Sequence, residues 1–153
     1  MSTPEERIAE LGLEIPDVVT PLASYVPTAR TGAHVFTSGQ LPVVKGELIA
    51  TGKVGAEIDP ERAAELAKIC ALNAIAAVRA EVGDLSRVRR IAKVVGFVAS
   101  APDFYGQPQV INGASDLLGE VFGDAGRHAR SAVGVAVLPR NAPVEVELIA
   151  EVE

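Results

Sequence analysis

Hydrophobic residues occupy every second position of the segment Val144–Val152, and three glutamates stand among the positions between them. A period of two places the apolar residues on one face of a β-strand and the glutamates on the other. Val88–Ala99 and Arg130–Leu138 are more continuously apolar and predict two further long strands. Three shorter strands with intervening turns are predicted nearer the N-terminus, at Leu22–Thr28, His34–Ser38 and Glu47–Ile49.

Two longer segments have helical periodicity. The first covers residues 60–82, and its apolar positions fall on one face together with Cys70 and Asn73. We expect Cys70 to be a buried core thiol and Asn73 to hydrogen-bond to a neighbouring loop. The second helix is predicted over residues 103–122, with Asp103 as its N-cap.

A short helix is predicted near the N-terminus. Thr3 and Glu6 have the spacing of a capping box, and Pro4 stands at the first helical position. Gly12 is expected to end this helix.

The predicted order of elements is that of an α+β protein, with two helices covering one face of a mixed sheet. A chain of 153 residues suits one domain, 1–153, in which residues 1–15 form a helical appendage and residues 22–152 the core. The apolar content of 48% and the mean hydropathy of +0.27 are high for a soluble monomer. The second face of the sheet also needs a cover, so we expect another subunit to supply it.

The composition argues against several classes of function. A net charge of -6 and a pI near 5.0 disfavour a nucleic-acid partner, and the basic cluster within residues 87–93 is expected to be a solvated strand end. Cys70 is the single cysteine, and the sequence has no Cys/His spacing typical of a metal site. The N-terminal segment is polar and no apolar run reaches the length of a membrane span, so we expect a cytoplasmic protein without membrane contact.

Arg130 is the leading candidate for binding chemistry. It begins a strand-like run in which alternate positions are small, namely Ala132, Gly134 and Ala136. A guanidinium beside a face with little side-chain bulk can hold a small carboxylate through two parallel hydrogen bonds. The alternative is an ordinary strand-end arginine, solvated or paired with a local acid, and the segment alone leaves both interpretations open.

Four segments together resemble the reactive-intermediate deaminases, the Rid or YjgF-type proteins, which are also called endoribonuclease L-PSP or translation inhibitor. The segments occur in the same order and with about the same spacing as in that family. They comprise residues 24–25 with 36–42, residues 70–73, residues 102–112, and residues 129–133 with 138–147. The sequence NGASDLL at residues 112–118 and the longer N-terminus indicate a divergent branch.

The resemblance implies a chorismate-mutase-like fold and a homotrimer with a cleft between each pair of subunits. It also implies hydrolysis of 2-imino or 2-enamino acids to 2-keto acids and ammonia, without a metal or organic cofactor. The ligand would be a small carboxylate, an imino or keto acid.

Seven positions correspond to pocket residues of that family. Arg130 matches the carboxylate-binding arginine, and Glu145 matches the acid associated with the attacking water. The remaining matches are expected to bind the substrate, and they are Tyr25, Ser38, Gly39, Ala132 and Asn112. Ala132 stands where the family often has cysteine, which leaves only a main-chain role there.

Geometry adds an expectation about assembly. If Arg130–Leu138 and Val144–Val152 form a direct hairpin, Arg130 lies near Val152 and roughly 20 Å from Glu145 at the rise of a strand. One chain then cannot bring Arg130 and Glu145 together, so the site would be shared between subunits.

Other functions remain open at this level. A binding or chaperone-like module would use Arg130 as a carboxylate clamp without turnover. Ribonuclease activity is suggested only by the older family label, and the acidic charge disfavours it. Glu145 could be a solvated carboxylate and Tyr25 a packing residue, and we expect structural roles for His34 and His128, with a supporting role near Arg130 also open to His128.

Overall fold

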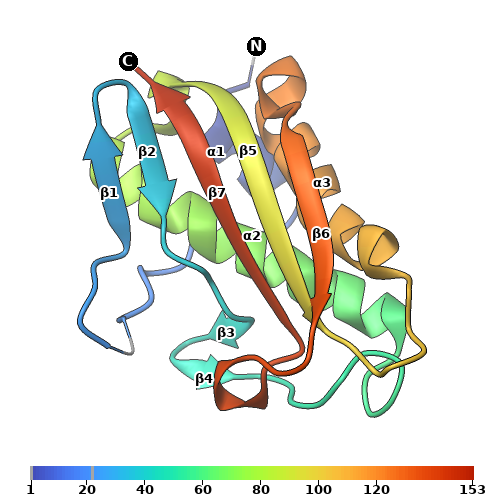
Figure 1. The fold of residues 1–153 in the computed structure, drawn as a ribbon. Helices are drawn as coiled ribbons and strands as arrows, with labels where there is room; N and C mark the ends of the chain where they lie inside the picture. The colour runs from blue at the N-terminus through green and yellow to red at the C-terminus, as the bar shows by residue number, and fades with distance from the viewer. Residues whose placement is uncertain (1, 22) are drawn as a thin grey trace.

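A five-stranded mixed sheet forms the centre of the protein, in a computed structural model that describes residues 2–21 and 23–153 (Figure 1). The strands lie in the order β1-β2-β7-β5-β6, and all neighbours are antiparallel except β5 and β6, which are parallel. The five strands are β1 (Thr28–Thr31), β2 (His34–Thr37), β5 (Val88–Ala99), β6 (Ala129–Val135) and β7 (Val144–Val152). A separate two-stranded ladder pairs β3 (Val43–Val44) with β4 (Glu47–Leu48).

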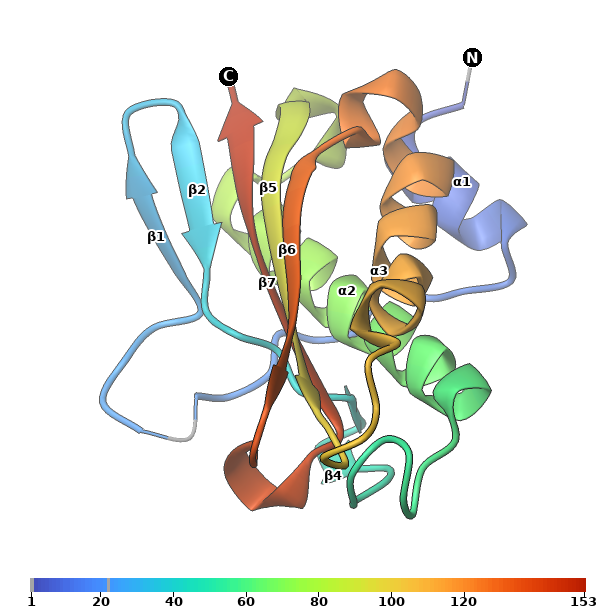
Figure 2. The same ribbon diagram turned by 45° about the vertical axis from the view of Figure 1, so that its right-hand side comes forward.

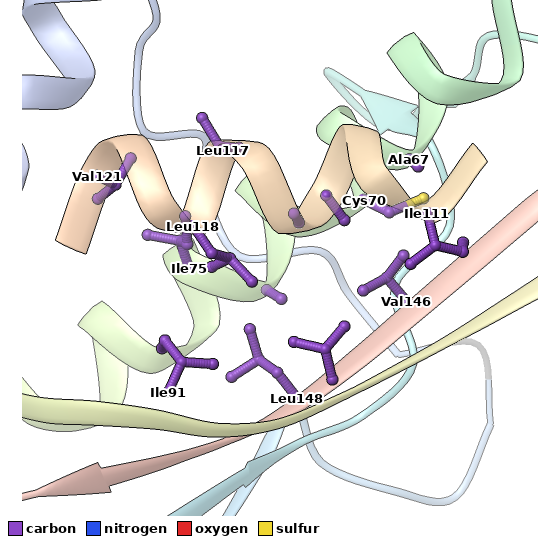
Figure 3. Close-up of a cluster of buried hydrophobic side chains, with 14 of the residues drawn as sticks. Ala67, Cys70, Ile75, Ile91, Ile111, Leu117, Leu118, Val121, Val146 and Leu148 are labelled. Carbon is purple, nitrogen blue, oxygen red and sulfur yellow. The ribbon is translucent and has the colours of Figure 1, made fainter. Parts of the chain in front are cut away.

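Two helices, α2 (Pro60–Val82) and α3 (Gln107–Phe122), cover one face of the five-stranded sheet, as Figure 2 shows. The alternation along β7 explains this layer, because its apolar positions are buried while the residues between them are only partly covered. Figure 3 shows the resulting core, in which Leu118, Ile75 and Leu148 come from both helices and the sheet. The predicted α+β architecture is therefore confirmed.

Three short 3₁₀ turns connect these elements. They are η1 (Leu85–Arg87) before β5, η2 (Gly123–Gly126) after α3, and η3 (Pro139–Asn141) between β6 and β7.

The N-terminal helix α1 (Pro4–Glu10) has the predicted capping box, in which Thr3 and Glu6 satisfy each other's backbone N–H groups. Ile8 is buried against the core. Arg7 Nη1 donates to the carbonyl of Val121 in α3 at 3.2 Å, so the helix is fixed to the rest of the chain by both packing and hydrogen bonding.

Asn73 and Cys70 occupy the core as predicted. Asn73 Nδ2 donates to the carbonyls of Leu41 and Val43 at 3.2 and 3.0 Å, which attaches the loop before β3 to α2. The Cys70 side chain is fully buried. Burial, and to a smaller extent the charge of Glu145, raise the pKa of its thiol well above the ordinary value, so it is an inert packing group.

Some predicted boundaries were wrong. Asp103 is not an N-cap, because α3 begins only at Gln107 after Gly106, whose position has no side-chain cap. The strand predicted at Leu22–Thr28 is instead β1 at Thr28–Thr31, and Leu22 itself lies outside the described residues. The strand predicted to reach Leu138 ends at Val135, and the turn η3 begins at Pro139.

The predicted hairpin between the last two strands was also wrong. β5 lies between β6 and β7, so that Arg130 pairs with Val94, and Val94 pairs with Leu148. The cause is the β5–α3–β6 crossover, which places β6 parallel to β5 on the side away from β7. Arg130 is therefore level with Leu148, three residues from Glu145, and the offset along the strand is roughly 10 Å, not 20 Å.

The crossing of α2 and α3 requires a glycine at position 113. A β-carbon added there would collide with the backbone carbonyl of Ala64 in α2. We expect Gly113→Ala to lower the free energy of unfolding by roughly 1–3 kcal/mol, the usual cost of overpacking. Chemical denaturation measures this change.

Gly119 supplies the matched control in the same helix. A β-carbon at Gly119 would meet no atom within 4 Å. Gly119→Ala should therefore raise the free energy of unfolding by about 0.5–1 kcal/mol, because alanine is the better helix former. Equal effects of the two variants would contradict this account of the helix contact.

Candidate active site

Arg130 lies on the helix-covered side of the sheet, because its pairing partner Val94 is fully buried beneath α2 and α3. Its guanidinium donates to three oxygens of α3, and all three are neutral. Arg130 Nη1 donates to Asn112 Oδ1 at 2.8 Å and to Ser115 Oγ at 3.2 Å. Arg130 Nη2 donates to the carbonyl of Pro108 at 3.4 Å.

No acid neutralises this guanidinium. In the described part of the chain the side-chain ion pairs are Arg62–Glu65 and Arg79–Glu5, and neither includes Arg130. A partly buried guanidinium held by neutral oxygens keeps its full positive charge and part of its donor set for a ligand. The interpretation of Arg130 as one half of a local ion pair is therefore wrong.

His128 and Ser115 form a second layer behind Arg130. The ring nitrogen Nδ1 of His128 is 2.6 Å from the carbonyl of Gly126, and because a carbonyl only accepts, Nδ1 carries the proton. In the neutral ring Nε2 then accepts the hydroxyl of Ser115 at 2.9 Å, and the same hydroxyl oxygen accepts from Arg130. The sequence offered a supporting role for His128 among its alternatives, whereas Ser115 carried no recognisable signal.

Ala132 and Gly134 continue the face that Arg130 begins. A β-carbon at Gly134 would come within 2.7 Å of Gln107 Nε2, so the first turn of α3 covers the small residues of β6. Ala132 packs against the core from the same side. The predicted row of small residues is present within β6, and Ala136 lies beyond its end.

A second group of candidate residues surrounds the loop after β2. Tyr25, Ser38 and Gly39 line a small hollow of about 30 Å³. Ser38 Oγ donates to the carbonyl of Val26 at 2.5 Å, and the Ser38 N–H donates to the carbonyl of Pro27 at 2.8 Å. These bonds attach the Tyr25 segment to the loop that carries Gly39.

Glu145 lies directly against this loop. A β-carbon on Gly39 would collide with the Glu145 carboxylate, so the absence of a side chain at position 39 leaves room for that carboxylate beside the loop. Gln40 fixes the approach, since its N–H donates to the carbonyl of Val146 at 2.8 Å and its carbonyl accepts from the Val146 N–H at 3.0 Å.

The surroundings of Glu145 raise the pKa of its carboxyl group above the ordinary value. Partial burial is the larger cause, because it disfavours the charged form, and the nearby charge of Glu147 adds to it. A carboxylate with a raised pKa is a better proton acceptor than a solvated one.

The two groups of residues lie on opposite sides of the sheet. Arg130 is in register with Val94 and Leu148, both buried under the helices. Glu145 occupies an alternate position of β7, and its partner Phe97 is on the face that the helices leave open. One chain therefore places Arg130 with Asn112, and Glu145 with the Tyr25 loop, but it does not unite the two groups.

We also searched the described residues for a metal centre and for a membrane-spanning helix. Within residues 2–21 and 23–153, no three His, Cys, Asp or Glu side chains are placed to hold a metal ion together. No helix in the same ranges is long and apolar enough to cross a bilayer.

A family model described as "YjgF/chorismate_mutase-like, putative endoribonuclease" matches residues 5–152. The chain belongs to this YjgF/chorismate-mutase-like family, which confirms the resemblance seen in the sequence.

Three relatives show the range of this similarity. The crystal structure of Atu1372 from Agrobacterium tumefaciens is 47% identical, with a TM-score of 0.93 over 98% of this chain and 92% of that one. Protein TCP17 of Trypanosoma cruzi is 42% identical over 146 residues, 95% of this chain and 91% of the relative. TdcF of Escherichia coli, named a "putative reactive intermediate deaminase", is 30% identical over 131 residues, 84% of this chain and 87% of its own.

The solved structure of Escherichia coli TdcF contains bound serine. It superimposes with a TM-score of 0.61 and covers 90% of this chain and 93% of that one. This chain is thus more similar in structure to Atu1372 than to the relative named a deaminase.

Proposed function

We propose that the protein hydrolyses small 2-imino and 2-enamino acids to 2-keto acids and ammonia, in clefts between the subunits of a homotrimer. The observation that carries the proposal is the uncompensated guanidinium of Arg130, held by neutral oxygens of α3. A guanidinium in this state matches a carboxylate in charge and in the spacing of its donors. The serine bound to TdcF, a relative in the same family, is a small molecule with such a carboxylate.

The site requires two copies of the chain. One copy would supply Arg130 and Asn112, and the next would supply Glu145 with the loop of Ser38 and Gly39. The open face of the sheet favours such an assembly, because it exposes large apolar side chains such as Phe36 and Val133. Within a single chain, the Arg130 group and the Glu145 group lie on opposite sides of the sheet. A cleft between two subunits would bring one group from each copy together.

The first half of the reaction adds water to the imine carbon. Arg130 holds the substrate carboxylate, which fixes the C=N carbon beside the water. Glu145 accepts a proton from the attacking water while the oxygen bonds to that carbon. The electron pair of the C=N bond moves to the nitrogen, which takes up a second proton from solvent. An enamine enters the same route after protonation at carbon converts it to the imine.

The second half releases ammonia. Protonated Glu145 returns its proton to the nitrogen, the C–N bond breaks and ammonia leaves with the electron pair of that bond. The carbinol oxygen loses its proton to solvent as the C=O bond forms. The net reaction consumes one water and leaves Glu145 in its starting state. The raised pKa of Glu145 suits both steps, because the same group first accepts and then donates a proton.

Imine trapping tests this function. An amino-acid oxidase generates the imine in the presence of semicarbazide, which captures any imine that survives. Purified protein should lower the yield of semicarbazone in proportion to its concentration. An unchanged yield across several neutral and acidic amino acids would contradict the proposal, and keto-acid binding without that change would identify a binding module instead. Cleavage of RNA that depends on Arg130 would also contradict it.

A further inference from the structure

Arg140 is a second arginine at the candidate site. It belongs to η3 and lines the same hollow as Tyr25, Ser38 and Gly39. It also lines a larger cleft of about 780 Å³, which runs between residues 14–21, the turn after β3 and helix α2. Arg140 is therefore one of the residues shared by the linings of the two cavities.

The charge of Arg140 is uncompensated in the small hollow. Of the residues that line this hollow, Arg140 alone carries a full charge, and none of them is an acid. Within the described part of the chain its guanidinium makes no hydrogen bond and no ion pair. The larger cleft differs, because Glu14 and Asp17 face it together with Lys45 and Arg140 and balance its charge.

The backbone holds Arg140 in an unusual conformation. Arg140 and Asn141 have φ values of 59° and 61°, a left-handed region that residues other than glycine seldom occupy. The carbonyl of Asn141 accepts from the Gly52 N–H at 2.9 Å, and the Asn141 N–H donates to the carbonyl of Leu138 at 3.1 Å. Such conformations persist where the surroundings fix them, and here they fix the backbone from which the Arg140 side chain extends.

We infer that Arg140 binds a second carboxylate of the substrate, so that the preferred substrates are imines of acidic amino acids. This inference rests on the proposed function, in which Arg130 of another copy holds the carboxylate next to the imine carbon. With that end fixed and the imine carbon beside Glu145, the hollow lies next to the substrate, because Gly39 both contacts the Glu145 carboxylate and lines the hollow. One planar guanidinium matches one terminal carboxylate there.

Binding of two keto acids of equal length tests the inference. 2-Oxoglutarate and 2-oxopentanoate both have five carbons, and they differ in a carboxylate against a methyl group at the far end. Calorimetric titration should show about tenfold tighter binding of 2-oxoglutarate, because one additional charge-assisted contact changes the affinity by about that factor. Arg140→Gln keeps a polar side chain but removes the charge, and it should bring the ratio close to one by weakening 2-oxoglutarate alone.

Lys45→Gln is the matched control, because Lys45 lines the larger cleft but not the small hollow. It removes the same unit of charge and should leave most of the preference in place. Wild-type protein that shows no preference, or a preference that Arg140→Gln leaves unchanged, would overturn the inference.

Calorimetric titration together with imine trapping separates this inference from the proposed function. Turnover of the norvaline imine without any preference for the glutamate imine would refute the role of Arg140 and retain the deaminase activity. Arg140-dependent binding of 2-oxoglutarate without turnover of either imine would refute the deaminase activity and retain the second carboxylate site. Failure to bind either keto acid, together with no turnover of either imine, would overturn both.

Discussion

Arg130→Ala is expected to reduce kcat/KM for imine hydrolysis by roughly 10²–10⁴-fold. Two charge-assisted hydrogen bonds to the substrate carboxylate are lost, and each contributes about 1.5–3 kcal/mol. The loss also frees the imine carbon to move relative to the water. Steady-state kinetics with an enzymatically generated imine measure the effect.

Two further variants give this prediction its controls. Arg130→Lys keeps the charge but not the fork, so it should recover part of the lost activity, mainly through a lower KM than that of Arg130→Ala. Arg127→Ala removes an exposed arginine three residues away and should leave kcat/KM within about twofold. Similar losses in the Arg127 and Arg130 variants would show that general charge, and not the fork of Arg130, sustains activity.

Glu145→Gln is expected to lower kcat by roughly 10²–10⁴-fold, the usual contribution of a general acid or base. Glutamine has nearly the same shape but accepts no proton, so binding of 2-oxopentanoate should change little. Calorimetric titration of the keto acid beside turnover of the matching imine separates the two effects. Equal loss of binding and turnover would assign Glu145 a structural role.

The same substitution should stabilise the fold at neutral pH. Because the folded protein raises the pKa of Glu145, the folded state binds this proton more tightly than the unfolded chain does. Ionised Glu145 therefore costs stability above its folded pKa, and this cost disappears as the pH falls through that value. Denaturation at pH 8 should show a higher free energy of unfolding for Glu145→Gln than for wild type, with the gain shrinking as the pH falls toward the ordinary carboxyl range.

Glu147→Gln is the matched control on the same strand. It removes the neighbouring charge that adds to the raised pKa of Glu145. Turnover should persist, and the acidic limb of the kcat/KM profile should move to lower pH. A profile that stays in place would show that the limb belongs to another group.

The bounds of the long strands and of the long helix near the site could be predicted from the sequence. The segments predicted at Val88–Ala99 and Val144–Val152 have those same bounds in β5 and β7, and α2 ends where Gly83 follows it. A long run of period two or 3.6 survives local irregularities, whereas β1 and the start of α3 depend on a few residues and were misplaced.

The strand that pairs with β6 could not be predicted from the sequence in this way. A strand's own pattern shows which face is buried but not which neighbour it joins. Residues 136–143 resemble a hairpin loop, and the pairing with β5 is decided by the packing of α3 across the sheet. The correction strengthens the case for a shared site, because the two groups are separated by the sheet itself and not only by distance along it.

Some residues of the candidate site could be predicted from the sequence, and others could not. Arg130 and Glu145 could be chosen from the sequence because they match a family pattern. Ser115 and Arg140 could not, since a serine in a helix and an arginine after a proline have no distinctive spacing. Their significance lies in contacts and cavities formed between segments that are distant in the sequence.

The central claim is that Arg130 of one copy and Glu145 of another act on the same substrate. Arg130→Ala and Glu145→Gln chains can be unfolded together in equal amounts and refolded as mixed assemblies. In a ring of three, about one quarter of the clefts would then receive an intact arginine and an intact glutamate from adjacent copies. We expect about a quarter of wild-type activity to return, whereas mixtures that remain as inactive as their parent variants would contradict the account.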